Sequence, residues 1–366
     1  MKVIQTGNEF RICGNGIRTF EELPTRTYTV GYNQRDGCFL VERDDLEVSE
    51  KAYGAQLSKA DKVLKSFENF NRNLGVILSG DKGIGKSMFA KNVCVRALKK
   101  GFPVIIVDAC HKGLAGFLTS IDCKCAVLFD EFDKIFTANE ENDEQAELLS
   151  MFDGTDGGKK LFIVTCNNLY GLNSYLINRP GRFHYHIRFE YPTEDDIREY
   201  LTDKLKKSRY GEIEKVVEFS HKVSLNYDCL RSIAYELNCG YDFRDSIADL
   251  NIMVTEKEEY NVYLYFENGA SVHHFVYRTN LYDYDGLLTC ISLYNDDGEF
   301  VCDAVYDKTA AKYDVQKDCV VIPAESIKLK NLNDDDECDC ASDFRGLKIS
   351  YMTFSKRQKQ NLHYSL

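Results

Sequence analysis

Residues 75–92 read GVILSGDKGIGKSMFAKN, and this segment indicates the fold class. It reads as an apolar strand, a glycine-rich loop and the start of a helix, and it matches the pattern Gly-x-x-x-x-Gly-Lys-Ser/Thr at Gly80, Gly85, Lys86 and Ser87. Glycines allow the backbone to wrap closely around a phosphate, so that N–H groups and the helix N-terminus face the anion. The sequence therefore predicts a phosphate-binding loop.

The loop also predicts the bound group. In this pattern the lysine, Lys86, reaches the β- and γ-phosphates of a nucleotide, and the hydroxyl of Ser87 binds Mg²⁺. We therefore expect ATP and Mg²⁺ as the ligands. The expected nucleotide contacts in the loop are Gly80, Gly83, Ile84, Gly85, Lys86, Ser87 and Met88.

Apolar runs alternate with helical segments on both sides of the loop. The runs are GVIL (75–78), VIIV (104–107), AVLF (126–129), LFIV (161–164) and HIRF (186–189). Continuous apolar strands between helices indicate a parallel sheet that is covered on both faces. The expected fold class is α/β, with a phosphate-binding core on a parallel sheet of five strands.

Two of these strands end in polar residues. The run CAVLFDEFDK ends in Asp130 and Glu131, and we expect Asp130 to bind Mg²⁺ and Glu131 to act as the general base on an attacking water. Ligands bind at the carboxyl ends of parallel strands, where the run LFIVTCNN supplies Asn167 to orient that water or to contact the γ-phosphate. Asp133 and Lys134 are interpreted as surface or pairing residues.

Composition excludes several classes of protein. The chain has 366 residues, 44% of them apolar, and a net charge of −12, which disfavours broad nonspecific nucleic-acid binding but leaves a local basic groove open. An apolar run long enough for a membrane helix and the apolar core of a signal peptide are both missing, so we expect a cytoplasmic protein. The 14 cysteines form no CxxC pair and are interpreted as reduced thiols, with metal binding the less favoured alternative.

The chain divides into four expected segments: a β-rich region at 1–50, the phosphate-binding core at 51–192, a helical subdomain at 193–252 and a β-rich domain at 253–366. The helical subdomain begins at the expected N-cap Thr193. The last segment holds 12 Lys and Arg against 20 Asp and Glu, a net charge of −8. Most of the negative excess therefore lies in this segment.

The order of the motifs resembles the AAA family of ATPases, including its second region of homology. After Lys86 and Asp130 follow LLSMFDG (148–154), VTCNN (164–168) and LNSYLINRPGRF (172–183). The similarity covers residues 50–250 and implies an AAA+ core with a helical lid. It also implies that the sensor asparagine is Asn167 rather than Asn168.

The resemblance gives Arg179 and Arg182 a role. They fall on the two arginine-finger positions of the family, whose members form rings, commonly of six subunits, in which the fingers reach the ATP of a neighbouring subunit. An arginine supplied in this way stabilises the charge that develops on the γ-phosphoryl group. Without the resemblance, surface exposure or an internal salt bridge would explain the two arginines equally well.

The chain also departs from the family pattern. The segment between the second strand and Asp130 is short, and its GLAGF offers Phe117 without the usual order of an aromatic–aliphatic–glycine pore loop. Phe117 is therefore interpreted equally as a core residue or as a substrate contact. A shortened segment with an LINRPGRF ending is similar to the Rieske-protein translocase branch and to phage-encoded AAA ATPases. If the protein is phage-encoded, the expected cytoplasm is that of the host.

In the lid, Arg231 of NYDCLRSIAYEL is either a second sensor over the γ-phosphate or a solvated helix residue. The preferred function is an ATPase ring that remodels or disassembles an unidentified protein partner, with no membrane attachment. The alternatives are a nucleic-acid motor or loader and an ATP-gated scaffold or switch.

Overall fold

The structure is a computed structural model. It describes residues 2–6, 9–14, 18–48, 51, 53, 56–136, 138–139, 142–153, 159–169, 172, 176, 181–221, 223–250, 252, 257–281, 288–314, 316–317, 319–330, 344 and 346–357. Within this part of the chain, no helix combines the length and the apolar character that a membrane span requires.

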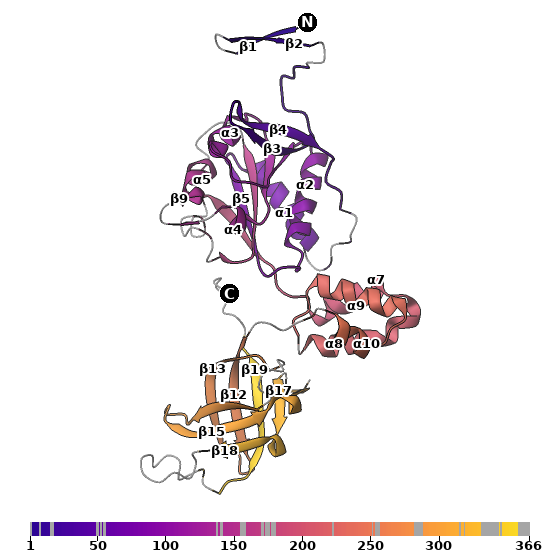
Figure 1. Cartoon of the computed structure of the whole chain (residues 1–366), viewed down its shortest axis with the longest axis vertical. Coiled ribbons are helices and arrows are strands. Elements are labelled where there is room, and N and C mark those ends of the chain that lie inside the picture. Colours follow the sequence, from indigo (N-terminus) through magenta and orange to yellow (C-terminus); the bar gives the residue numbers. More distant parts are fainter. Residues whose placement is uncertain are drawn as a thin grey trace. The chain divides into compact units, whose positions relative to one another are not determined.

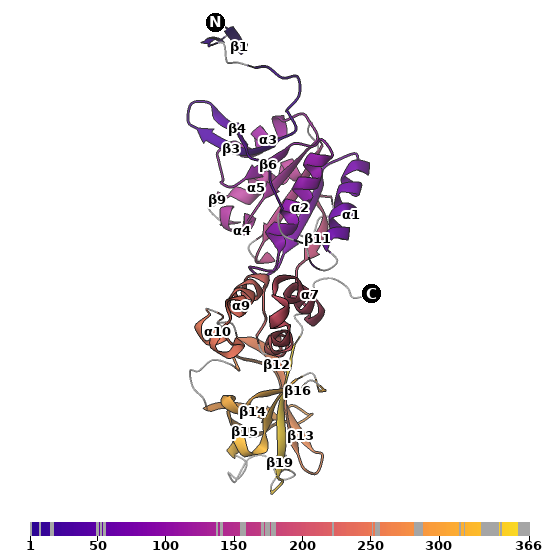
Figure 2. The same cartoon turned by 90° about the vertical axis from the view of Figure 1, so that its right-hand side faces the viewer.

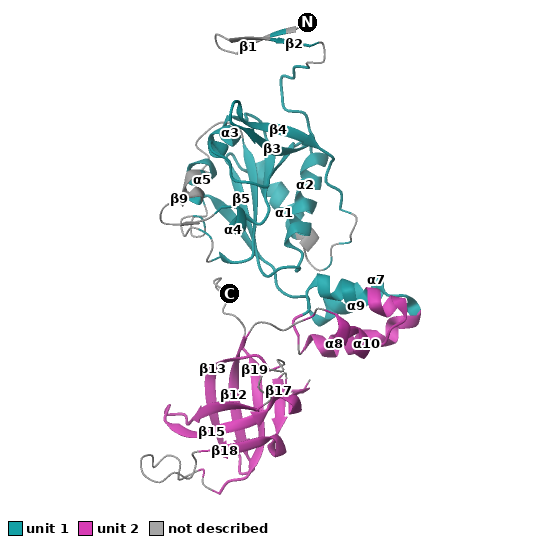
Figure 3. Cartoon of the chain, in the orientation of Figure 1, with its two compact units in different colours: residues 1–207, 225–234 teal, residues 208–224, 235–366 magenta. Residues whose placement is uncertain are grey.

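Contacts divide the chain into two compact units (Figure 3). Unit 1 comprises Met1–Lys207 and Leu225–Ala234, and unit 2 comprises Ser208–Ser224 and Tyr235–Leu366. The boundary passes through the expected helical subdomain, because one of its helices begins in unit 1 and ends in unit 2. The expected division into four segments stays a prediction.

A mostly parallel sheet forms the centre of unit 1 (Figure 1). Its five expected parallel strands are β5 (Leu74–Ser79), β6 (Val104–Val107), β7 (Cys125–Phe129), β10 (Lys160–Cys166) and β11 (Phe183–Arg188). Every residue of β5, β7 and β10 is buried, as expected for strands covered on both faces. Because β10 lies between β5 and β7, the ends of these three strands are neighbours.

The sheet is larger than the sequence predicted. Among the described residues it has seven strands, in the order β11, β5, β10, β7, β6, β3 and β4. The two additional strands, β3 (Thr27–Asn33) and β4 (Gly37–Arg43), form a hairpin within the β-rich region expected at 1–50. Because β3 pairs in parallel with β6, this hairpin extends the sheet of the core, and the prediction of a five-stranded sheet was wrong. Upstream, β1 (Lys2–Thr6) and β2 (Glu9–Cys13) form a hairpin of their own.

Helices cover both faces of this sheet (Figure 2). On one face, α1 (Gln56–Asn69) and α2 (Lys86–Lys99) pack through residues such as Phe67 and Phe89. On the other face, α3 (Leu114–Ser120), α4 (Phe132–Ile135) and α5 (Glu144–Asp153) pack around Phe129 and Phe162. Short strands β8 (Ala138–Asn139) and β9 (Asn142–Asp143) form a small hairpin between α4 and α5.

Helices follow the sheet, as the sequence predicted. Thr193 caps α7 (Glu194–Lys204) in a capping box with Asp196. After η2 (Lys207–Glu212) come α8 (Ile213–Ser220), α9 (Tyr227–Cys239) and α10 (Phe243–Asp249). The turn after α9 contains Gly240 with φ 104°, a conformation that commonly ends a helix.

Unit 2 carries an antiparallel sheet around its own apolar core. Among the described residues the order is β16, β17, β19, β12, β13, β14, β15 and β18. The strands are β12 (Glu258–Phe266), β13 (Ser271–Thr279), β14 (Leu288–Tyr294), β15 (Phe300–Asp307), β16 (Lys312–Asp314), β17 (Cys319–Pro323), β18 (Ile327–Lys330) and β19 (Ile349–Lys356), with short helices η3 (Lys308–Ala310) and η4 (Ala324–Ser326). The structure thus contains a second β-rich part, as the sequence predicted.

Candidate nucleotide-binding site

A cavity of about 510 Å³ lies in unit 1 where the chain leaves β5, β7 and β10. Its volume is within the usual range for a small-molecule site. It is lined by Glu47, Val48, Lys51, Tyr53, Lys82, Gly83, Gly85, Lys86, Ser87, Met88, Lys91, Glu131, Thr165, Asn167, Tyr200, Tyr227, Asp228 and Arg231. Segments that are far apart in the sequence therefore meet at one cavity.

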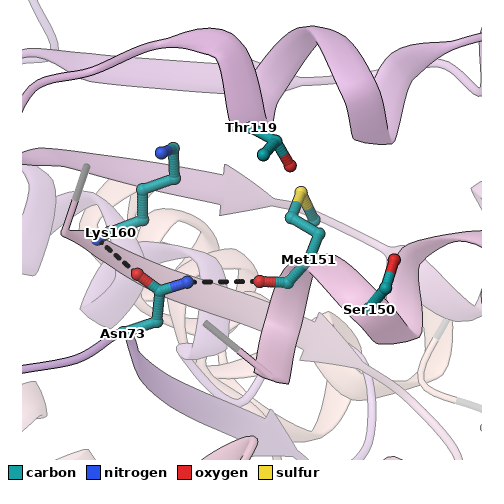
Figure 4. Close-up of a pocket in the computed structure, with 5 residues that line it drawn as sticks. All are labelled: Asn73, Thr119, Ser150, Met151 and Lys160. Carbon is teal, nitrogen blue, oxygen red and sulfur yellow. Dashed lines mark hydrogen bonds between the residues drawn. The ribbon is translucent and has the colours of Figure 1, made fainter. Parts of the chain in front are cut away.

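A second, much smaller cavity lies near the start of β10 (Figure 4). Its volume is about 10 Å³, room for about one water molecule. There the side chain of Asn73 accepts the Lys160 N–H (2.9 Å) and donates to the Met151 carbonyl (3.2 Å). This cavity is too small for a nucleotide, and its polar contacts join β10 to α5.

The glycines of the loop have backbone angles that other residues avoid. Gly80, Gly83 and Gly85 have φ values of 139°, 75° and 99°. A Cβ on Gly80 would lie 2.5 Å from both the Phe189 carbonyl oxygen and Ile84 Cδ1. The loop is therefore too tightly packed for a side chain at Gly80, and α2 starts directly behind the loop.

Lys86 is buried at the floor of the loop. Its ammonium donates to the carbonyls of Gly80 (2.6 Å) and Asp81 (2.5 Å) and to Asn167 Oδ1 (3.0 Å). Burial lowers the pKa of Lys86, and nearby carboxylates oppose this effect. A positive charge at this point suits a phosphate ligand.

Asp130 joins the loop to the ends of β7 and β10. Its Oδ1 accepts hydrogen bonds from Ser87 Oγ (3.0 Å) and Thr165 Oγ1 (2.6 Å). Thr165 Oγ1 in turn accepts the backbone N–H of Glu131 (2.8 Å). The hydroxyl of Ser87 and the carboxylate of Asp130 are thus side by side.

These two groups fit Mg²⁺. The ion prefers hard oxygen ligands and is usually held by one or two carboxylates together with substrate phosphates. Ser87 and Asp130 supply such oxygens beside the phosphate-binding loop. Among the described residues, no group of three or more His, Cys, Asp or Glu side chains could hold a metal ion by itself, so the phosphates would complete the shell. Mg²⁺ bound there would neutralise charge on those phosphates.

Glu131 has an unusual conformation for a residue other than glycine. Its φ is 55°, in the left-handed region, where such strain is stored mainly at functional sites. Its carboxylate is paired with Lys134, and this hydrogen bond lowers the pKa of Glu131. The side chain is 51% exposed and lines the cavity. An ionised carboxylate that faces the cavity meets the requirements of a general base.

Most of the expected site residues line the cavity. They are Gly83, Gly85, Lys86, Ser87, Met88, Glu131, Asn167 and Arg231. Gly80, Ile84 and Asp130 lie behind this lining, with Ile84 in the apolar core. Arg179 lies outside the described residues.

The two other expected arginines have different surroundings. Arg231 is half-exposed on α9 and pairs with Asp228, Nη1 to Oδ1, at 3.3 Å. Arg182 is only 7% exposed and directly precedes β11. Among the described residues, then, Arg231 reaches the cavity and Arg182 does not.

Three tyrosines beside the cavity were not predicted as site residues by any motif in the sequence. Tyr53 packs against Tyr200 and Tyr227 with ring centroids 5.0 and 6.0 Å away, and its hydroxyl donates to Asp203 (2.6 Å). They come from three separate segments, so neither spacing nor periodicity connects them. Their rings form an apolar wall of a kind that suits a planar base.

The start of α9 contacts the phosphate-binding loop directly. The Tyr227 N–H donates to the Gly83 carbonyl (3.0 Å), and Asn226 Nδ2 donates to the Lys82 carbonyl (3.1 Å). Asn226 Oδ1 also accepts the Cys229 N–H (2.8 Å), so this side chain is fixed at both ends. A Cβ on Gly83 would lie 2.7 Å from Asn226 Nδ2.

Gly83→Ala is therefore expected to lower ATP affinity by about 10-fold, the scale of one or two lost hydrogen bonds. Gly113→Ala is the matched control, because Gly113 has φ 79° and open space around its Cβ position. Both variants should lose stability from the positive φ. The readouts are the melting temperature and the dissociation constant for ATP. Equal affinities in the two variants would contradict the proposed contact between α9 and the loop.

A match to a known protein family supports nucleotide binding at this site. Residues 76–191 match the model of the ATPase family associated with various cellular activities (AAA). No curated protein matches the chain. The family match supports an ATPase of the AAA type, and nucleotide binding by a P-loop is a general property of such domains.

Proposed function

We propose that the AAA domain at residues 76–191 binds ATP with Mg²⁺, hydrolyses it, and uses the resulting conformational change to remodel a protein partner. One set of contacts carries the hydrolysis: Lys86 of the loop donates to Asn167 Oδ1, and Asp130 accepts from Ser87 of the loop and from Thr165. The site thus combines a phosphate-binding cation, oxygen ligands for Mg²⁺ and an exposed carboxylate. These are the parts that positioning and charge stabilisation in phosphoryl transfer require.

Each residue has a proposed task. The loop and Lys86 hold the phosphates, and Ser87 with Asp130 holds Mg²⁺. Glu131 accepts a proton from the attacking water, and Asn167 orients that water or contacts the γ-phosphate. Lys134 is bonded to one carboxylate oxygen of Glu131, Oε1, and we assign the other oxygen to the attacking water.

The site lacks an arginine near the transferred phosphate in the described part of one chain, apart from Arg231. We assign the missing charge to a neighbouring chain in a ring of identical subunits, with six as the proposed number. Of the two candidates, we favour Arg179, because Arg182 is 7% exposed in its own subunit and a buried side chain cannot extend to another. Arg182 would instead serve the packing before β11.

Mixing two inactive variants tests this arrangement. Arg179→Ala lacks the finger and Lys86→Ala lacks the phosphate contact, so a mixed ring contains some sites with both groups intact. In an equimolar mixture about one quarter of the sites should be complete, and ATP hydrolysis should recover to about that fraction of the wild-type rate. The measurement is phosphate release, with size-exclusion chromatography to show that each variant still assembles. Mixed rings that remain inactive would contradict a shared site.

An ATP-gated scaffold is the second candidate, and one observation favours it. Between β6 and β7 the chain forms a single short helix, α3, and Phe117 on this helix is half-buried against the apolar core. A residue packed in this way is a poor contact for a polypeptide in a pore. Slow hydrolysis with ATP-stabilised oligomers would support the scaffold, whereas rapid steady turnover would support remodelling. Stimulation of hydrolysis by DNA or RNA would instead indicate a nucleic-acid motor.

A further inference from the structure

Asp133 connects the segment after β7 to the segment after β10. It lies on α4, three residues beyond Asp130. Its Oδ2 accepts the backbone N–H of Asn167 (3.0 Å) and that of Asn168 (3.4 Å). Asp133 and Lys134 are thus both pairing residues, as the sequence allowed: Asp133 pairs with backbone N–H groups and Lys134 pairs with Glu131.

This contact acts on a residue with a functional side chain. Asn167 is the first residue after β10, so its N–H lies beyond the hydrogen-bond ladder that β10 forms with β5. Its side-chain Oδ1 accepts a hydrogen bond from Lys86 Nζ (3.0 Å). A backbone held at N–H by a carboxylate fixes the direction in which the side chain points. Without Asp133, the Asn167 side chain would have more freedom relative to Lys86.

The other carboxylate oxygen of Asp133 lowers the stability of the fold. Oδ1 is buried and, in the described part of the chain, has no hydrogen-bond partner. An acceptor in this situation is destabilising, so an aspartate that served packing alone would be a poor choice here. Asp133 also lies near enough to Lys86 for its charge to oppose the effect of burial on the pKa of that lysine.

Thr165 forms a second connection between the same two segments. It bonds both to Asp130 and to the Glu131 N–H, as described above. The segment after β7 is thus joined to the end of β10 through Thr165 and to the residues after β10 through Asp133. A shift of Asn167 would therefore be transmitted to the segment that carries the proposed base.

We propose that Asp133 is a positioning residue for hydrolysis, which holds Asn167 in place against Lys86. This inference rests on the proposed function of the site. Asp133 touches neither the nucleotide nor the water, and its effect on the rate passes through Asn167. A carboxylate suits this task because it accepts two adjacent N–H groups at once.

A double-mutant cycle tests the inference in the full-length chain. Asp133→Ala should lower kcat by about 10- to 100-fold, the scale of hydrogen bonds to a charged acceptor, with a much smaller change in the dissociation constant for ATP. Asp133→Asn keeps one acceptor oxygen and should recover part of the rate. In an Asn167→Ala background, Asp133→Ala should change kcat by less than about 2-fold, because the group through which it acts is gone.

Asp314→Ala is the matched control. Asp314 likewise accepts two neighbouring backbone N–H groups, those of Gln316 (3.0 Å) and Lys317 (3.2 Å), but it belongs to unit 2. Its replacement should leave kcat unchanged. Melting temperatures show whether each variant is folded, and Asp133→Asn replaces Asp133→Ala in the cycle if the latter unfolds.

The outcomes separate the two claims. If the effects of Asp133→Ala and Asn167→Ala multiply, or if Asp133→Ala hydrolyses ATP at the wild-type rate, the positioning role is wrong while the proposed function stands. If the wild-type chain does not hydrolyse ATP at all, the proposed function fails, and the role of Asp133 fails with it.

Discussion

Replacing Glu131 with glutamine should lower the rate of ATP hydrolysis by about 100-fold or more, the usual contribution of a general base. ATP binding should persist, because glutamine has nearly the same shape and the phosphate contacts come from the loop. The strained backbone of Glu131 is held by its N–H bond to Thr165, which does not involve the carboxylate. The measurements are steady-state phosphate release and the dissociation constant for ATP.

Glu68→Gln is the control for this variant. Glu68 is also a partly exposed carboxylate paired with a lysine, Lys100, but it lies on α1 away from the cavity lining. The Glu68→Gln variant should hydrolyse ATP at the wild-type rate. If Glu131→Gln and Glu68→Gln had equal activity, another group would have to be the base.

Replacing Lys86 with alanine should have the next largest effect, a loss of ATP affinity of about 10- to 100-fold. The substitution removes the buried ammonium and leaves two loop carbonyls and Asn167 Oδ1 without their donor. Calorimetric titration with ATP would measure the loss. Lys100→Ala removes an exposed lysine of the pair with Glu68 and should bind ATP normally. A Lys86→Ala protein with wild-type affinity would mean that the phosphates bind elsewhere.

The sequence predicted the loop and its strands because their signals are local. A glycine pattern in residues 80–87 specifies a backbone shape directly, and the apolar runs specify strands buried on both faces. The acidic end of β7 and the polar end of β10 could then be placed together, since parallel strands end at the same edge of a sheet. Their hydrogen bonds through Asp130 follow this expectation.

Other features depend on contacts that no local pattern encodes. The sequence indicated a β-rich region at 1–50 but not that Thr27 of β3 pairs with Val104 of β6. Asp133 stands among several charged residues after β7, and nothing in its spacing indicates that it accepts the Asn167 N–H. Tyr53, Tyr200 and Tyr227 are likewise far apart in the sequence, and only the fold brings their rings together.

In the proposed function, one site binds ATP through Lys86 and the loop, and Glu131 then acts as the base in hydrolysis. The most direct test measures ATP affinity and Mg²⁺-dependent phosphate release in parallel for the wild type, Lys86→Ala and Glu131→Gln. We predict that the wild type binds and hydrolyses ATP, that Lys86→Ala loses both properties, and that Glu131→Gln binds ATP but does not release phosphate. Phosphate release from Glu131→Gln at the wild-type rate, or no binding of ATP by the wild type, would contradict the claim.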